Sequence, residues 1–146
     1  MIVDKTQLAA EIRKRVSEMD PQKIEEAIKK LDSFDVSVSA FCSFSSWVIH
    51  FDVSCIVGSL ISTCPAFKGG GWGAGFPGGG ISAGTVHTDD LDVLYANTSA
   101  FSFGSVGLYF TIEFWDKSSN LLGSFQAANI GTPAGGGGKG TWTVCP

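Results

Sequence analysis

The residues of this chain whose types and spacing could do chemistry begin in a glycine-rich stretch near its middle. Gly73, Gly75 and Gly78 match the spacing G-x-G-x-x-G of dinucleotide-binding loops. That motif binds a pyrophosphate between a parallel strand and the N-terminus of a helix, whereas Pro77 and further glycines follow it here. A glycine-rich composition alone explains the match. We therefore expect no nucleotide cofactor.

The next segment, residues 80–84 (GISAG), matches the G-x-S-x-G pattern of serine hydrolases. A nucleophile elbow needs a strand–turn–helix unit, with an acidic residue and then a histidine further along the chain. His87 lies five residues after Ser82, and no acidic residue stands between them. Chance in a Gly/Ser-rich segment is the better explanation, and we predict that the chain is not an enzyme.

A short acidic run offers oxygen ligands of the kind that calcium prefers. Asp89, Asp90 and Asp92 lack the central glycine and the twelfth-position glutamate of an EF-hand loop. We favour a solvated acidic turn in which Thr88 caps a short helix. The two histidines are not closely spaced with any cysteine, so we predict no metal site and no cofactor of any kind.

Four cysteines are present but form no C-x-x-C or C-x-x-H pair. The first thirty residues are charged and lack a continuous apolar stretch, so we expect no signal peptide. The chain is then made in the cytoplasm, with release or delivery to a host by a non-classical route. In that setting we expect the cysteines to be buried small hydrophobic residues rather than disulfides. Whether Cys55 and Cys64 ever pair stays open.

Exposed aromatic side chains could stack on a sugar or lie at a bilayer interface. Trp72 and Phe76 fall in a glycine-rich segment almost without charge, and we predict that they form a binding loop, with Trp115 as a further binding residue. The alternative is that Trp72 and Phe76 fold back onto the end of the domain. Trp47 and Trp142 lie in expected strands and are predicted to belong to the core.

Charge divides the chain into two parts. Residues 1–35 hold seven of the ten Lys/Arg and eight of the fourteen Asp/Glu, whereas all nineteen glycines come later. We therefore predict a helical N-terminal extension over residues 1–35 and a second domain over residues 36–146. A net charge of −4 without a basic cluster argues against nucleic acid as a partner.

Apolar residues spaced by three and four predict two amphipathic helices in the extension. The first, over residues 4–19, has this apolar face: Leu8, Ile12, Val16 and Met19. Asp20 and Pro21 then provide the N-cap and first residue of the second helix. The pair could cap the second domain, join two copies of the chain through residues 4–31, or serve in docking and delivery.

From residue 36 onward the apolar period changes to two, which is typical of strands with one buried face. Alternating segments occur at 36–44, 47–57, 99–103, 108–115 and 120–128. A third strand is expected at Leu60 to Thr63, where Pro65 stops it, and Gly140 to Cys145 closes the chain. Seven or eight short strands at regular spacing predict a mainly β fold, either a barrel or a sandwich.

Two glycine-rich segments, residues 69–80 and 135–140, interrupt this pattern. Glycine permits positive φ and close backbone approach but contributes nothing to a core. Long flexible loops are one interpretation. Tight corners at which strands bend to close a barrel are the other.

The segment from Gly84 to Trp142 resembles the virulence-associated protein (Vap) family first recognised in rhodococci. The resemblance is carried by GTVHTDDLDVLYANTSAFSF (84–103) and VGLYFTIEFWDKSSNLLGSFQA (106–127), followed by a glycine-rich stretch and a last strand with Trp142. Residues 36–83 fit the family in pattern only, and residues 1–35 depart from it. The resemblance implies a closed eight-stranded antiparallel barrel made of two similar halves and brings no catalytic residues. It also implies action in the phagocytic vacuole of a host, on membranes.

The sequence thus predicts a non-enzymatic virulence or toxin-like factor whose barrel binds a host membrane lipid or another host surface component. Trp72, Phe76 and Trp115 are its predicted binding residues. The alternative is a protein- or carbohydrate-binding or assembly module in which the helices mediate oligomerisation. A barrel interior filled by Val, Ile and Phe would leave little room for a buried ligand.

Overall fold

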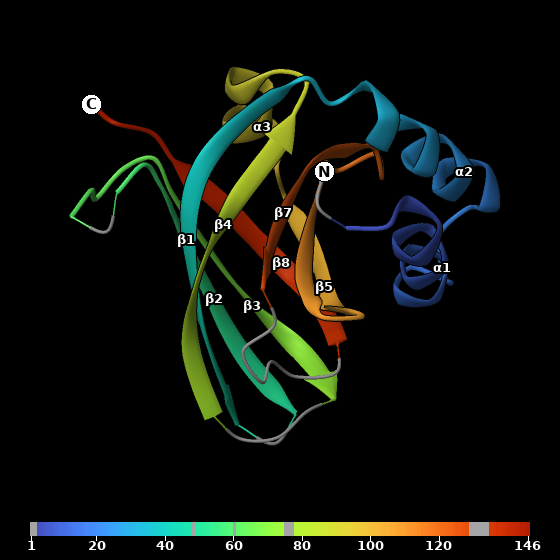
Figure 1. The fold of residues 1–146 in the computed structure, drawn as a ribbon, viewed down its shortest axis with the longest axis horizontal. Helices are drawn as coiled ribbons and strands as arrows, with labels where there is room; N and C mark the ends of the chain where they lie inside the picture. The colour runs from blue at the N-terminus through green and yellow to red at the C-terminus, as the bar shows by residue number, and fades with distance from the viewer. Residues whose placement is uncertain (1–2, 48, 60, 75–77, 129–134) are drawn as a thin grey trace.

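The strands of the second domain form a closed antiparallel barrel, which confirms the predicted fold class (Figure 1). The computed structural model describes residues 3–47, 49–59, 61–74, 78–128 and 135–146. The strands are β1 (Val36–Trp47), β2 (His50–Val57), β3 (Ala66–Ala74), β4 (Gly78–Thr88), β5 (Ala100–Val106), β6 (Tyr109–Trp115), β7 (Leu121–Ala128) and β8 (Gly135–Thr143). Around the barrel they follow the order β1-β2-β3-β8-β5-β6-β7-β4.

Two helices, α1 (Lys5–Arg15) and α2 (Pro21–Lys30), precede the barrel, and the 3-10 turn Leu31–Ser33 follows them. Each helix begins at an aspartate whose carboxylate accepts hydrogen bonds from backbone N–H groups of the first turn, Asp4 for α1 and Asp20 for α2. The predicted cap at Asp20 is therefore confirmed. The 3-10 turn ends at Ser33, and β1 begins at Val36, the residue at which the second domain was predicted to begin.

The two helices lie against one side of the barrel, over the outer face of β5, β6 and β7 (Figure 1). Their apolar faces form a second core with that wall, made of Val3, Leu8, Ile12, Ala27, Leu31, Val106, Trp115 and Leu121. The apolar helix faces that could have joined two copies of the chain thus pack against the barrel of the same chain. A homo-oligomer through residues 4–31 stays a prediction.

Phenylalanine side chains fill the barrel interior. The buried ones are Phe51, Phe67, Phe101, Phe103, Phe110, Phe114 and Phe125. Many of their rings meet edge to face, for example Phe51 and Phe103 with centroids 4.4 Å apart. Trp142 is also buried, as predicted, whereas the side chain of Trp47 lies outside the described residues.

The glycine-rich segments are strands over most of their length, so the interpretation as long flexible loops was wrong for these residues. Residues 69–74 belong to β3 and residues 135–140 to β8, and the two strands pair directly, with glycine opposite glycine at three of these six register pairs. A Cβ atom at Gly71 would lie 2.3 Å from the carbonyl oxygen of Gly137. Glycine is therefore required by a close backbone approach, although its low strand propensity hid the strand.

Two other local predictions were wrong. No strand lies at residues 61–63, where Ser59 and Ser62 form a turn, and β3 begins at Ala66 after Pro65 rather than before it. Asp90, not Thr88, caps α3 (Leu91–Asn97), because Thr88 ends β4 and its hydroxyl donates to the carbonyl oxygen of Leu122 at 2.6 Å.

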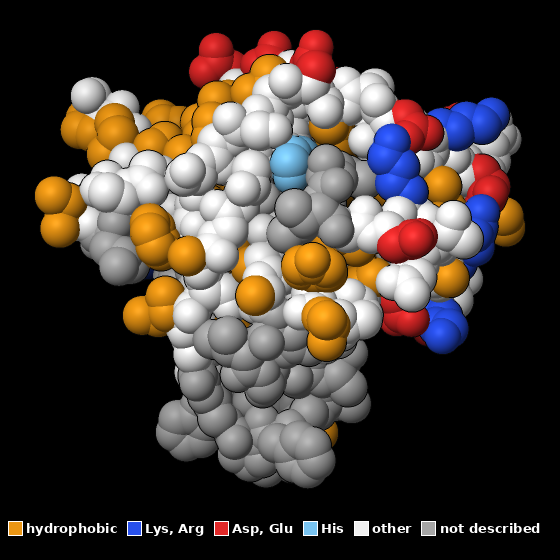
Figure 2. All heavy atoms as spheres, viewed as in Figure 1, with side chains coloured by type: hydrophobic (Ala, Val, Ile, Leu, Met, Phe, Trp, Pro, Cys, Tyr) orange, Lys and Arg blue, Asp and Glu red, His pale blue; other side chains and the backbone are white. Residues whose placement is uncertain are grey.

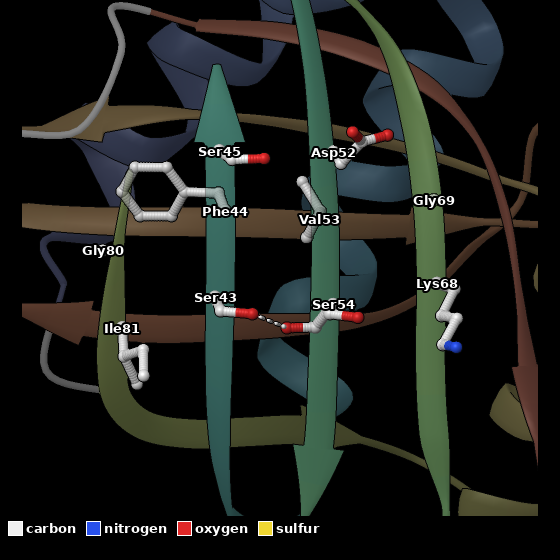
Figure 3. Close-up of a pocket in the computed structure, with 10 residues that line it drawn as sticks. All are labelled: Ser43, Phe44, Ser45, Asp52, Val53, Ser54, Lys68, Gly69, Gly80 and Ile81. Atoms are coloured by element: carbon white, nitrogen blue, oxygen red, sulfur yellow. Dashed lines mark hydrogen bonds between the residues drawn. The ribbon is translucent and has the colours of Figure 1, made fainter. Parts of the chain in front are cut away.

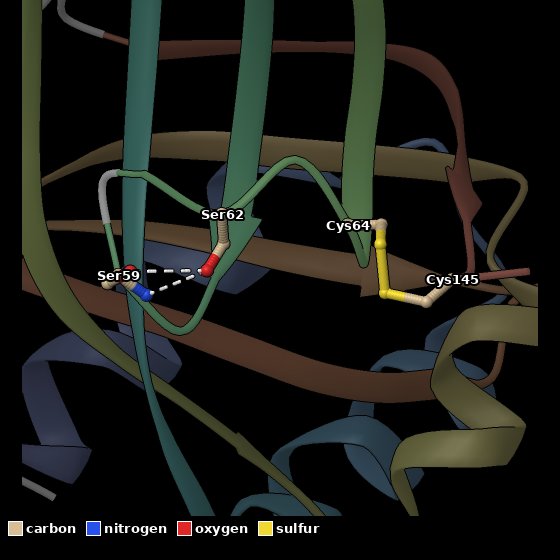
Figure 4. The surroundings of a disulfide bond; sticks show 4 residues. All are labelled: Ser59, Ser62, Cys64 and Cys145. Carbon is tan, nitrogen blue, oxygen red and sulfur yellow. Dashed lines mark hydrogen bonds between the residues drawn. A yellow bond between two sulfur atoms is a disulfide. The ribbon is translucent and has the colours of Figure 1, made fainter.

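The cysteines form two disulfides, which corrects the prediction that they are unpaired. Cys42 and Cys55 are register partners on β1 and β2 and both point into the barrel. Cys64 lies two residues before Ala66 of β3, and Cys145 lies two residues after Thr143 of β8, the register partner of Ala66. The second disulfide therefore continues the pairing of β3 with β8 beyond the strand ends (Figure 4). The sequence could not show either pairing, because both depend on which strands become neighbours.

Candidate binding surfaces

At one end of the barrel, here called the hairpin end, β1, β3, β5 and β7 end and β2, β4, β6 and β8 begin. Three large apolar side chains are exposed there: Ile49 at 59%, Trp72 at 67% and Leu108 at 84%. Among the described residues of the connections at this end and the three nearest residues of each adjoining strand, Asp52 is the one Asp, Glu, Lys or Arg. The hairpin end is therefore apolar and nearly free of charge.

The opposite end, here called the acidic end, has a different surface. Asp89, Asp90 and Asp92 lie at the start of α3, and Figure 2 shows carboxylates gathered over this region at the top of the view. Asp116 lies in the β6–β7 turn at the same end. An exposed apolar residue, Ile61 at 92%, is present here as well. The two ends thus differ in charge more than in the presence of apolar side chains.

Trp72 is exposed as predicted, but it stands on strand β3 rather than in a loop. Its register partners are His50 on β2 and Gly137 on β8. The His50 ring meets the indole edge to face, with centroids 5.5 Å apart, on the side away from β8. On the β8 side no side chain adjoins the indole at that position, because the partner is glycine. Phe76, the second predicted residue, lies outside the described residues.

Trp115, the third predicted binding residue, is buried with 3% exposure, so this prediction was wrong. Its side chain lies on the outer face of β6 but under the helical extension. The indole Nε1–H donates to the Ser102 hydroxyl at 3.0 Å. The sequence placed Trp115 at the end of a strand and could not show that a helix covers that face.

A buried polar network beside Trp115 escaped sequence analysis. The Arg15 guanidinium donates to both Glu113 carboxylate oxygens at 2.8 Å and to the Thr111 hydroxyl at 2.6 Å, and the Ser102 hydroxyl donates to Glu113 at 2.8 Å. The Arg15 and Glu113 side chains are 6% and 0% exposed. This network fastens α1 to the barrel. A glutamate within the apolar run YFTIEFW was the available signal, because a buried carboxylate needs a partner.

An open hollow of about 610 Å³ lies on the outer side of β1 to β4 (Figure 3). Serine hydroxyls line it together with Asp52 on β2 and Lys68 on β3. The Ser43 hydroxyl donates to the backbone carbonyl of Ser54 at 3.4 Å rather than to a side-chain base. The hollow therefore exposes mainly hydroxyl and charged groups on the outer face of the sheet.

Two titratable groups of the barrel are shifted by burial. Burial lowers the pKa of His87, whose Nδ1 lies 2.9 Å from the Ser37 hydroxyl. Burial also raises the pKa of Tyr95 on α3. Among the described residues, no three His, Cys, Asp or Glu side chains gather where they could hold a metal ion. Likewise, none of the helices in the described part of the chain combines the length and apolar character needed to cross a membrane.

Comparison with known proteins places this architecture in a family. A family model described as Rhodococcus equi virulence-associated protein matches residues 2–143. The match extends the resemblance expected for residues 84–142 to nearly the whole chain. It also includes the N-terminal region, which the sequence analysis had set apart from the family. No curated protein matches the chain in sequence.

Two solved structures share the fold, the virulence-associated proteins VapB and VapD, both from the intracellular pathogen Rhodococcus equi. Each is 28% identical with a TM-score of 0.68. The alignment covers 75% of this chain and 98% of VapB or 99% of VapD, so about a quarter of this chain has no counterpart in either structure. By the family match and by this structural similarity, the chain belongs to the family of Rhodococcus equi virulence-associated proteins.

Proposed function

We propose that this chain is a non-enzymatic virulence or toxin-like factor whose barrel binds the lipid surface of a host membrane through its hairpin end. The observation that carries the proposal is the exposure of Ile49, Trp72 and Leu108 at an end where Asp52 is the one charged residue among the described connections and the strand residues beside them. Tryptophan favours the boundary between lipid and water, and the isoleucine and leucine side chains add apolar surface that can enter lipid.

The orientation follows from charge. An anionic bilayer repels the carboxylates of the acidic end, so the hairpin end faces the lipid. Each large apolar side chain that leaves water contributes about 1.5–3 kcal/mol. Two or three such residues suffice for reversible binding without a membrane-spanning segment.

A host membrane as target requires that the chain leave the cell that makes it. The two disulfides support this step, because disulfides persist in oxidising environments and are rare in the bacterial cytoplasm. The non-classical route expected from the sequence remains part of the proposal.

The test is co-flotation of the intact protein with neutral and anionic liposomes at pH 7 and pH 5. We expect binding that strengthens at pH 5, because acidification reduces the negative charge of the chain. Ile49→Ser and Leu108→Ser should each weaken binding about 10-fold or more, the effect of withdrawing one apolar side chain from lipid.

The matched control is Ile61→Ser, the same substitution at an exposed isoleucine of the acidic end. It should leave binding unchanged. A protein that floats under none of these conditions would refute the proposal. Equal losses in Ile49→Ser and Ile61→Ser would refute the assignment to the hairpin end.

A further inference from the structure

A groove of about 580 Å³ separates the helical extension from the barrel wall. One bank is the segment from Arg15 to Met19, where α1 ends and the chain turns toward α2. The other bank is Trp72 on β3, and the floor is formed by Gly136 and Gly137 of β8. We call it the extension groove, because it exists only where the extension and the barrel meet.

The register of the strands explains why the groove is open. Trp72 pairs with Gly137 on β8, which in turn pairs with Ser102 on β5. Two strand spacings separate Trp72 from Ser102, about 10 Å. No side chain rises between them, and a Cβ atom at position 137 would lie 2.9 Å from the carbonyl oxygen of Phe101. The floor beside the indole is therefore clear of side chains at this register position.

Both banks are held in place before any ligand arrives. Arg15 is 6% exposed and tied by hydrogen bonds to Glu113, Thr111 and the backbone carbonyl of Ser105. Trp72 has the His50 ring against it on the side away from the groove. A site with rigid walls loses little conformational entropy on binding.

The lining combines an apolar plate with polar groups around it. The Trp72 indole is 67% exposed and offers a flat apolar surface. Glu18 and Ser17 are exposed on the opposite bank, and Ser119 of the β6–β7 turn also lines the groove. A carboxylate accepts hydrogen bonds from hydroxyls, and a serine hydroxyl can both donate and accept.

This combination matches the two faces of a pyranose ring, which has an apolar C–H surface and a rim of hydroxyls. We infer that the extension groove binds a neutral, pyranose-containing glycan, with one ring stacked on Trp72 and its hydroxyls bonded to Glu18 and Ser17. The Arg15 charge is balanced by Glu113, so Glu18 leaves the lining negative and disfavours sialylated or sulfated sugars. This site does not depend on membrane binding.

The experiment is titration calorimetry of the full chain against neutral hexose oligosaccharides, selected first on an array that also carries sialylated and sulfated glycans. We expect neutral glycans to bind. Trp72→Ala should weaken binding about 10-fold or more and Trp72→Phe by less, because an aromatic plate remains. Glu18→Gln should weaken binding several-fold, as expected for the loss of a charge-assisted hydrogen bond.

The control variant is Ile81→Ala, which removes another exposed apolar side chain of the barrel wall, 60% exposed and outside the groove. It should bind as the wild type does. Trp72, Glu18 and Ile81 are all exposed, so the variants should melt at the wild-type temperature. Three results would each overturn the inference: no neutral glycan bound by the wild-type chain either free or as a glycolipid headgroup, wild-type affinity in Trp72→Ala, or a preference for anionic sugars.

A second arm presents the selected sugar as a glycolipid headgroup in neutral vesicles. Binding of free oligosaccharide identifies a soluble or protein-borne glycan as sufficient. Binding confined to vesicles identifies the membrane as the source, and in that case it must be lost in Trp72→Ala for the inference to stand. Ile49→Ser should impair flotation on bare lipid and leave glycan binding intact, so the two proposals fail separately.

Discussion

The barrel has a covered wall and an open wall, built by the same strand alternation. The covered wall is the outer side of β5, β6 and β7, beneath α1 and α2. On β6 every residue after Tyr109 is buried. The open wall is the outer side of β1, β2 and β4, where buried residues of β2 alternate with the exposed His50 and Asp52.

The covered and open walls differ in the outward-facing residues of their strands. β6 reads YFTIEFW and is nearly continuous in apolar residues, as strands buried on both faces are. β1 reads VSVSAFCSFSSW, with serine at most outward positions. The composition of a strand's outer face therefore indicates whether a second layer of structure covers it.

The two walls are also held together by different means. The covered wall has the apolar cluster of the extension and the buried pair of Arg15 and Glu113. Both disulfides lie outside it: Cys42–Cys55 joins β1 to β2, and Cys64–Cys145 joins the start of β3 to the end of β8. The two disulfides thus join strands outside the wall that α1 and α2 cover.

The largest effect is expected from breaking the covered wall at its ion pair. Arg15→Ala leaves the Glu113 carboxylate buried without its cation and should lower the free energy of unfolding by about 3–5 kcal/mol. Urea unfolding measures this loss. The matched control is Arg13→Ala, which removes the partner of Glu25 in an exposed pair and should change stability little. Similar losses in the two variants would contradict the distinct role of the buried pair.

A smaller effect is expected from removing the crosslink that spans the longer segment. Cys64→Ser with Cys145→Ser frees a segment of 81 residues and should cost about 2–4 kcal/mol, mainly through the entropy of the unfolded chain. Hydrogen exchange should then accelerate in β3 and β8 before it does in β6. Faster exchange in β6 alone would contradict a stabilising role of this disulfide in β3 and β8.

The smallest effect is a pH dependence on the open wall. Burial lowers the pKa of His87 in the folded state, so the unfolded chain takes up its proton first as the pH falls. The contribution of His87 to stability is fully present above its pKa in the unfolded chain, about 6.5. It is lost as the pH falls below that value toward the lower pKa of the folded state. Melting temperatures at pH 7.5 and 5.5 should therefore differ more for the wild type than for His87→Gln. Equal differences in both proteins would show that His87 contributes nothing to this dependence.

The sequence by itself determined most of the features that rest on near neighbours in the chain. The period of two placed most strands, Asp20 and Pro21 marked the start of α2, and the run from Gly84 to Trp142 indicated the family. These signals are local, because burial on one face of a strand or capping of a helix involves residues only a few positions apart.

Tertiary structure alone decided the features that depend on contacts between distant segments. The pairing of β3 with β8 turned the glycine segments into strands and brought Cys64 to Cys145. The docking of α1 on β6 buried Trp115 and formed the opposite bank of the groove beside Trp72. The period of a strand shows which residues share a face but not what will cover that face, because the covering layer comes from another part of the chain.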